Sequence, residues 1–190
     1  MKIIENFDVS VEKEELILML GGDLSNSERA LKIINANLDA YNEGLDLVKP
    51  KAIYDVIEID RIEGNRLYLD SQEYFESKLI PLLMSGTKYL AICVVTVGMD
   101  LENRVEEYMQ QGKQVKGLIL DGVGTVVLEK VGLQIREILK EEAVMRNLDF
   151  SAALSPGQVG WDVEDQSKIF KRLDAERIGV KLRPSSLMVP

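Results

Sequence analysis

The sequence of 190 residues contains no histidine and only one cysteine. Without an imidazole there can be no Ser-His-Asp triad, no histidine metal ligand and no histidine-based proton transfer. The single cysteine, Cys93, cannot form a disulfide framework or one of the usual zinc sites, and its position in the apolar run 90–95 predicts a buried thiol. We therefore expect no catalytic residue and no metal site, and a reducing, cytoplasmic location.

Long apolar runs and basic clusters are also missing. No run approaches the roughly 20 residues that a membrane helix needs, and the N-terminus lacks the apolar core of a signal peptide. The net charge is -9, and basic residues gather in nothing larger than pairs such as Lys49 and Lys51. Because phosphate binding needs concentrated lysine and arginine, we expect neither nucleic acid nor a membrane as a partner. An acidic surface instead suits a protein partner with a basic face, or solubility alone.

Hydrophobic residues make up 46% of the chain, enough for a sizeable core in one domain. Helical and strand-like periods alternate without internal repeats and without a linker rich in Pro, Gly or Ser. We predict a single α+β domain with a mostly antiparallel curved sheet and flanking helices. Within it, residues 1–50 form an N-terminal helical segment and residues 51–190 form the α+β core.

The first 50 residues show helical periodicity. A helix is predicted over residues 11–20, where acidic residues fill the first turns and Gly21 and Gly22 end it. A longer helix is predicted from Ser27 to just before Pro50, because apolar residues recur at spacings of three and four: Leu31, Ile34, Leu38, Tyr41 and Leu45. This stripe indicates core packing rather than a cofactor site.

Strand-like patterns begin after residue 52. Residues 53–60 and 66–69 are predicted to form a β-hairpin around Gly64. Residues 72–84 are predicted to be helical with a kink at Pro81. The apolar stretch 89–97 is predicted to be a central strand that is buried on both faces.

A glycine-rich segment around Gly122 imitates a dinucleotide-binding loop. The third glycine of that fingerprint would fall at Val127, and no acidic residue ends a following strand at the right distance. We therefore prefer a helix over residues 118–145, preceded by a helix over 101–111 that Gly112 ends.

In the long helix, the glycines are expected to let neighbouring helices approach closely: Gly117, Gly122 and Gly124. Asp121 is expected to be a solvated helix residue rather than part of a ligand cleft. The acidic residues near the end of the helix are expected to form a solvated face, and no pair of them indicates an acid/base dyad: Glu137, Glu141 and Glu142.

The last fifth of the chain narrows the function furthest. Its loop 154–161 contains Pro156 and two glycines, which force an irregular backbone whose N–H and C=O groups are expected to be free to bind a ligand. A helix is predicted over residues 162–178, ended by Gly179 and followed by a short strand. Trp161, the only tryptophan, is expected to anchor the loop on this helix.

The order of residues in this region resembles the activation domain of vitamin B12-dependent methionine synthase, which binds S-adenosylmethionine. The resemblance is most specific over residues 155–190 and extends back to about Ala52. In that family the loop carries an arginine, three residues and then Gly-Tyr. Gly157 occupies the glycine position, whereas Ala153 and Gln158 replace the arginine and the tyrosine. The family continues past its Met-x-Pro end with a Ser-rich strand, and this sequence stops at Pro190.

The resemblance implies that S-adenosylmethionine is bound by the loop residues Leu154, Ser155, Pro156, Gly157 and Gln158. The missing arginine removes a charge-assisted contact worth roughly 1.5–3 kcal/mol. Gln158 keeps a donor and an acceptor for a polar group, or it is a plain surface residue.

The implied function is reactivation of a corrinoid (cobalamin) methyl carrier by reductive methylation from S-adenosylmethionine. The cobalamin is carried by the partner, a corrinoid-binding protein or methyltransferase, and the electron comes from a flavodoxin- or ferredoxin-like donor. Whether the chain itself counts as a methyltransferase-associated enzyme stays open. The alternative is a degenerate, non-catalytic module that docks on a corrinoid protein without binding S-adenosylmethionine. A different small-molecule enzyme that uses the same cleft has no catalytic constellation in its support.

Overall fold

The computed structural model describes residues 1–21, 27–158 and 160–190. The chain divides into two compact units. One comprises Met1–Ile3, Ile53–Val94 and Arg136–Val189, and the other comprises Ile4–Ala52 and Val95–Ile135 together with Pro190. The sequence-based division at residue 50 does not coincide with these units and stays a prediction.

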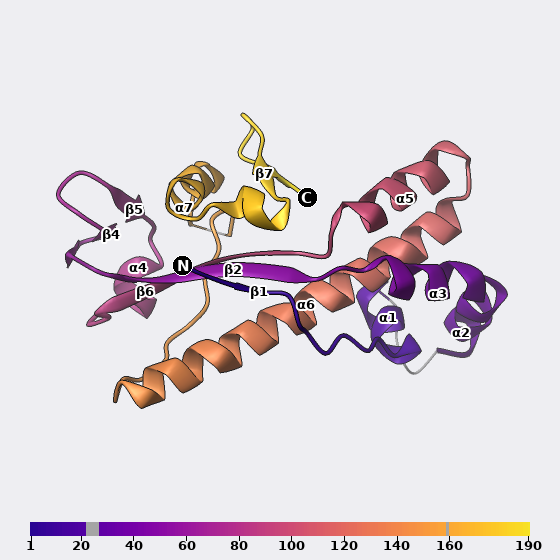
Figure 1. Cartoon of the computed structure of the whole chain (residues 1–190), viewed down its shortest axis with the longest axis horizontal. Coiled ribbons are helices and arrows are strands. Elements are labelled where there is room, and N and C mark those ends of the chain that lie inside the picture. Colours follow the sequence, from indigo (N-terminus) through magenta and orange to yellow (C-terminus); the bar gives the residue numbers. More distant parts are fainter. Residues whose placement is uncertain (22–26, 159) are drawn as a thin grey trace. The chain divides into compact units, whose positions relative to one another are not determined.

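Helices and short strands alternate along the chain (Figure 1). The α-helices are α1 Lys13–Met19, α2 Ser27–Ala36, α3 Leu38–Leu47, α4 Ile80–Leu83, α5 Met99–Gln110, α6 Gln114–Met145 and α7 Gln166–Arg172, with the 3-10 helices η2 Val163–Asp165 and η3 Ala175–Ile178. The strands are β1 Lys2–Ile4, β2 Lys51–Glu58, β3 Arg61–Glu63, β4 Arg66–Tyr68, β5 Tyr74–Glu76, β6 Tyr89–Thr96, β7 Lys181–Leu182 and β8 Met188–Val189. The predicted α+β class is confirmed, with small antiparallel sheets and flanking helices.

The strands form three small sheets in the described part of the chain. One has the order β1-β2-β6, one is the antiparallel meander β3-β4-β5, and the last is the antiparallel pair β7-β8. The predicted hairpin around Gly64 is present, but it joins β3 to β4, and β2 lies in a different sheet. The prediction that residues 53–60 pair with 66–69 is therefore wrong, since a second, shorter strand intervenes.

Helix α6 is the longest element of the chain, and helices α1 and α5 pack against it in the helical unit Ile4–Ala52 and Val95–Ile135 (Figure 1). A Cβ on Gly122 would lie 2.5 Å from Leu16 of α1, and a Cβ on Gly124 would lie 2.5 Å from Leu101 of α5. These glycines therefore let two neighbouring helices approach closely, as predicted. The continuous helix also confirms that the glycine-rich segment is no dinucleotide loop.

The predicted single helix from Ser27 to Pro50 is wrong, because two helices meet at Asn37. The backbone of Asn37 has φ -125° and ψ 35°, outside the helical region, and its side-chain amide donates to the carbonyl of Ile33 at 2.9 Å. An asparagine side chain that bonds the preceding turn competes with the next helical amide, so the chain changes direction there. The predicted stop at Gly22 lies outside the described residues.

The predicted helix over 72–84 is wrong in its first half. Residues Tyr74–Glu76 form β5, in which Phe75 pairs with Leu67 and is buried. Pro81 lies in the first turn of α4 rather than at a kink, because the first helical positions need no amide donor. Strand pairing across the meander overrides the helical spacing of the apolar residues.

Two further predictions are corrected by the packing of unit Met1–Ile3, Ile53–Val94 and Arg136–Val189. Strand β6 lies at an edge of its sheet and alternates, with Leu90 and Ile92 buried and Tyr89 exposed, so it is neither central nor buried on both faces. The predicted helix over 162–178 is broken into η2, α7 and η3. Gly179, with φ +88°, ends the last of these as expected.

A hydrophobic core fills this unit and positions the C-terminal loop. Side chains from β2, β4, β5, α4 and β6 pack against residues from the C-terminal segment: Trp161, Leu173, Ala175, Ile178 and Val180. The C-terminal segment is therefore held by apolar burial on the same core as the meander, which places loop 154–161 next to β5.

Candidate functional site

The predicted ligand loop lies between α6 and η2. Ser155, Gly157 and Gln158 are exposed, and Leu154 and Pro156 are half-buried. Gly157 has φ +95°, a left-handed conformation that strongly favours glycine. The glycine shared with the family signature is therefore required by the shape of this loop.

Most amide groups of the loop are already paired within it. The N–H of Gly157 donates to the carbonyl of Trp161 at 3.0 Å, and that of Gln158 donates to Ser155 at 3.2 Å. The N–H of Ser155 donates to the side-chain oxygen of Gln158 at 3.2 Å. The expectation that these three N–H groups are free for a ligand is therefore wrong. In this loop, three main-chain carbonyls accept no hydrogen bond from the described residues, namely those of Leu154, Pro156 and Gly157.

Gln158 therefore acts within the loop, and its side chain supplies neither an aromatic ring nor a charge to a ligand. Its side chain closes the loop by accepting from Ser155, and its main-chain carbonyl accepts from the amide of Trp161 at 2.9 Å. Ala153 is exposed, so an arginine at that position would meet no steric barrier from burial.

Trp161 anchors the end of the loop, as predicted. Its side chain is buried, and its ring meets that of Phe75 edge-on, with centroids 5.6 Å apart. Edge-to-face contact of two aromatic rings adds roughly 0.5–1.5 kcal/mol beyond the burial of apolar area. The main chain of Trp161 also forms an isolated antiparallel bridge with Ser77, so the loop is joined to the segment that follows β5.

Asp165 is the polar centre of this attachment. The carboxylate is buried and accepts from the indole N–H of Trp161 at 2.8 Å and from the main-chain N–H of Glu76 at 3.2 Å. The ammonium of Lys168 lies 2.5 Å from the second carboxylate oxygen and also donates to the carbonyl of Tyr74 at 2.7 Å. A buried charge with this many partners is stabilised, and it fixes η2 and α7 against β5.

Gly160 brings the loop onto the segment after β5. Its carbonyl accepts from the N–H of Lys78 at 3.2 Å and from the hydroxyl of Ser77 at 3.0 Å. Its φ of +90° again favours glycine, and an added Cβ would meet Cβ of Lys78 at 3.7 Å. The main chain of Lys78 is therefore held beside the loop.

A groove of about 440 Å³ opens where these elements meet. It lies between β5, the segment after it, the end of the loop, and η2 with α7, and it is lined by Asn65, Tyr74, Glu76, Ser77, Lys78, Gly160, Asp162, Glu164, Asp165 and Lys168. This volume falls within the roughly 300–1,000 Å³ of small-molecule sites. Of the predicted site residues, none lines the groove, although Gly160 of the same loop does.

Only some of the charged side chains that line the groove have a partner of opposite charge. Glu76 binds Arg66 at 2.8 Å, and Asp165 binds Lys168. Among the described residues, Lys78, Asp162 and Glu164 form no ion pair. The groove therefore presents one ammonium and two carboxylates that have no charged partner in the described chain.

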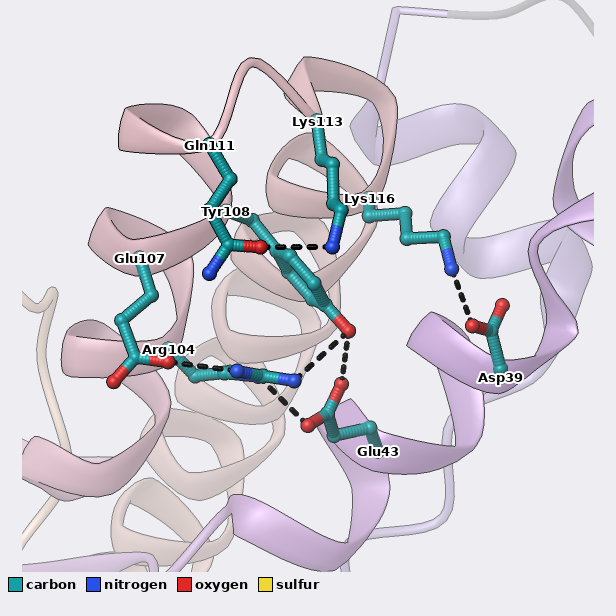
Figure 2. A network of polar contacts seen from close by, with 8 residues as sticks. All are labelled: Asp39, Glu43, Arg104, Glu107, Tyr108, Gln111, Lys113 and Lys116. Carbon is teal, nitrogen blue, oxygen red and sulfur yellow. Dashed lines mark hydrogen bonds and ion pairs between the residues drawn. The ribbon is translucent and has the colours of Figure 1, made fainter.

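A second polar network lies in the helical unit and joins α3 to α5 (Figure 2). The carboxylate of Glu43 accepts from Arg104 Nε at 2.8 Å and from the hydroxyl of Tyr108 at 2.6 Å. This hydrogen bond to Glu43 raises the pKa of Tyr108, with burial as the next cause. The guanidinium of Arg104 lies 4.4 Å from the centre of the Tyr108 ring and also binds Glu107 at 2.7 Å. Because Glu43, Arg104 and Tyr108 all have partners within it, the network is a structural clasp.

The remaining predicted residues take different positions. Asp121 is exposed, as expected. Glu142 is not part of a solvated face, because its carboxylate accepts from Lys2 at 2.5 Å and from the hydroxyl of Tyr54 at 2.7 Å. These hydrogen bonds, first that from Lys2 and then that from Tyr54, lower the pKa of Glu142. Cys93 is half-buried rather than fully buried, and burial raises the pKa of its thiol to about 12.

Within residues 1–21, 27–158 and 160–190, no group of three or more Cys, Asp or Glu side chains could hold a metal ion. Over the same residues, no helix is long and apolar enough to cross a membrane.

Comparison with family models gave no match, and comparison with curated proteins gave none either. Among solved structures, the chain is similar to a crystal structure of the MetH reactivation domain bound to AdoHcy, with a TM-score of 0.66 and 14% sequence identity. The match covers 100% of this chain and 74% of that chain. The chain therefore has the fold of this reactivation domain, which agrees at the level of fold with the family that the sequence resembles.

Proposed function

We propose that this chain presents S-adenosylmethionine to a corrinoid protein for reductive methylation, as the MetH reactivation domain fold suggests. The observation that carries the proposal is the full-length similarity to a reactivation domain that holds AdoHcy, the demethylated form of S-adenosylmethionine. The match covers 100% of this chain, and a groove of about 440 Å³ adjoins the end of the C-terminal loop here.

The groove fits the charge of the proposed ligand. S-adenosylmethionine carries a sulfonium and an ammonium, and carboxylates stabilise both cations. The carboxylates of Asp162 and Glu164, which form no ion pair with the described residues, line the groove and meet this requirement. We further propose that the carbonyls of Leu154, Pro156 and Gly157, which lie in the adjoining loop and outside the groove lining, accept from the adenine amino group. Thus the predicted loop residues supply acceptors rather than amide donors.

The proposed partner carries the cobalamin, and the proposed electron donor is flavodoxin- or ferredoxin-like. One electron reduces the partner's cobalt, after which the methyl group moves from the sulfonium to cobalt and leaves S-adenosylhomocysteine. In this scheme the chain contributes binding and orientation, and no side chain needs to donate or accept a proton. We propose a cytoplasmic location, because such carriers and donors work there.

The alternative is a docking module that no longer binds S-adenosylmethionine. The internal pairing of Ser155, Gly157 and Gln158, together with Ala153 at the arginine position, favours it. In this reading the loop is closed on itself and the surface around it contacts the corrinoid protein alone.

Calorimetric titration separates the two. We expect wild-type protein to bind S-adenosylmethionine with a dissociation constant near or below ~100 μM, about -5.5 kcal/mol. Ala153→Arg should bind roughly ten- to a hundredfold more tightly, because the arginine adds a charge-assisted contact to the ligand carboxylate. Ala152→Arg is the matched control, exposed one residue earlier, and should leave affinity unchanged. Silence of all three proteins at millimolar ligand would favour the docking module.

A further inference from the structure

We propose that the groove next to Gly160 is a receptor for an α-amino-acid group, with Lys78 on its carboxylate and Asp162 and Glu164 on its ammonium. The inference rests on the proposed function for the identity of the whole ligand, in which this group is the methionyl end of S-adenosylmethionine. It assigns the carboxylate contact to a residue of the segment after β5, outside the loop signature.

The first support is the balance of charge. An α-amino acid is a zwitterion, so its site needs one cation and at least one anion within a few ångströms of each other. Among ten lining residues, the groups without a charged partner in the described chain are Lys78, Asp162 and Glu164. The other three charged groups there do not compete, because Glu76 is held by Arg66 and Asn65, and Asp165 and Lys168 pair with each other.

The second support is the fixed position of Lys78. Its N–H donates to the carbonyl of Gly160, and the hydroxyl of Ser77 donates to the same carbonyl. The amide of Leu79 donates to the Ser77 hydroxyl at 3.1 Å, so the turn that carries Lys78 is held from both sides. A lysine on a fixed backbone loses less conformational freedom when it binds a carboxylate.

The third support is the position of the two carboxylates. Asp162 precedes η2, and one of its oxygens accepts from the N–H of Glu164 at 3.0 Å, which fixes the side chain. Its other oxygen and the carboxylate of Glu164 accept nothing from the described residues. The hydrogen bond from Trp161 to Asp165 holds this segment to the core, so the acidic and basic sides of the groove are both attached to rigid elements.

The α-amino-acid group that this groove binds has two possible sources, a free amino acid or the amino-acid end of a nucleoside sulfonium. The titration therefore uses three probes: S-adenosylmethionine, 5′-methylthioadenosine, which lacks the amino-acid group, and methionine. Each probe is titrated into wild type, Lys78→Ala, Lys78→Arg and the control Lys88→Ala, which removes an exposed lysine outside the groove.

We expect Lys78→Ala to weaken S-adenosylmethionine roughly ten- to a hundredfold, by loss of one charge-assisted contact. Lys78→Arg should restore most of the affinity, Lys88→Ala should match wild type, and 5′-methylthioadenosine should bind all four proteins equally. Equal binding of S-adenosylmethionine to Lys78→Ala and wild type would overturn the inference and leave the proposed function intact.

Two other outcomes separate the proposals further. If methionine binds in a Lys78-dependent manner while S-adenosylmethionine does not bind, the amino-acid receptor stands and the proposed function falls. If no probe binds wild type at millimolar concentration, both fall. Equal losses for S-adenosylmethionine and 5′-methylthioadenosine in Lys78→Ala would also overturn the inference, because they would show a general effect on the groove.

Discussion

The indole N–H of Trp161 donates to the carboxylate of Asp165 at 2.8 Å. The same oxygen of Asp165 accepts from the main-chain N–H of Glu76 on β5, so one buried carboxylate joins the end of the ligand loop to the meander. Loss of this carboxylate would leave both donors without their acceptor. The geometry of the proposed site therefore depends on a residue whose own role is structural.

Replacement of this carboxylate should be costly. Asp165→Ala is expected to lower the free energy of unfolding by roughly 2–4 kcal/mol, because the buried indole N–H of Trp161 and the half-buried amide of Glu76 lose their acceptor. Urea denaturation followed by circular dichroism measures the change, and the emission of the single tryptophan should shift to the red. Glu164→Ala, one residue away and exposed, is the control and should change stability by less than about 0.5 kcal/mol. Equal stability of the two variants would contradict the role given to Asp165.

The clasp between α3 and α5 predicts a second effect on stability. Glu43→Ala removes the acceptor of Arg104 and Tyr108 and should cost about 1–2 kcal/mol, a value reduced by partial exposure of the pair. Asp46→Ala, on an exposed position of the same helix, should be close to neutral.

The same variant has a spectroscopic readout. The hydrogen bond to Glu43 raises the pKa of Tyr108, so Glu43→Ala should move this pKa down toward the ordinary tyrosine value. Titration of labelled tyrosine by NMR measures it, with Asp46→Ala as reference. An unchanged Tyr108 pKa in Glu43→Ala would show that the contact is absent in solution.

Two glycines of α6 should respond in opposite directions to alanine. In Gly122→Ala the new methyl group would lie 2.5 Å from Leu16, which is fully buried, so overpacking should outweigh the gain in helix propensity and cost about 1–2 kcal/mol. Gly132→Ala meets nothing within 4 Å and should stabilise by about 0.5–1 kcal/mol. Thermal unfolding of both variants checks this, and stabilisation by both would mean that α1 packs differently on α6.

The thiol of Cys93 predicts a loss of stability at high pH. Burial raises its pKa to about 12 in the folded state, whereas a cysteine in the unfolded chain titrates near ~8.5. Between about pH 9 and 12 the unfolded state releases a proton that the folded state keeps, so the free energy of unfolding falls with pH by at most ~1.4 kcal/mol per unit. Below pH 8 the contribution is fully present.

Cys93→Ala should lack this component. The check is the difference in the free energy of unfolding between about pH 8 and pH 10, measured by urea denaturation for wild type and variant. Wild type should lose more stability than Cys93→Ala over this interval. Parallel losses would place the thiol in contact with water.

The sequence predicted the local features that depend on neighbouring residues. The packing role of Gly122 and Gly124, the stop at Gly179 and the anchoring role of Trp161 are all confirmed, because each follows from short-range chemistry of glycine or from the size of an indole. Some of the wrong predictions concern pairing between strands. Helical spacing around Phe75 was overridden by strand pairing with Leu67, which no local pattern reveals.

The site was predicted only in part for the same reason. The order of residues predicted the loop around Gly157. It did not reveal that the amides of Gly157 and Gln158 donate to the carbonyls of Trp161 and Ser155. Lys78 was missed entirely, because it reaches the loop through Gly160 across a long stretch of sequence and carries no local motif. Such a residue can be identified only from the structure, in which the segment of Lys78 and the loop end at Gly160 are in contact.

The most direct test of the central claim is methyl transfer. S-adenosylmethionine with a deuterated methyl group is mixed with a cobalamin-loaded methionine synthase corrinoid domain and titanium(III) citrate, with and without this chain, and methylcobalamin is measured by mass spectrometry. We predict that labelled methylcobalamin forms in proportion to the amount of chain added. Formation at the same rate without the chain, or none in its presence, would contradict the proposed role.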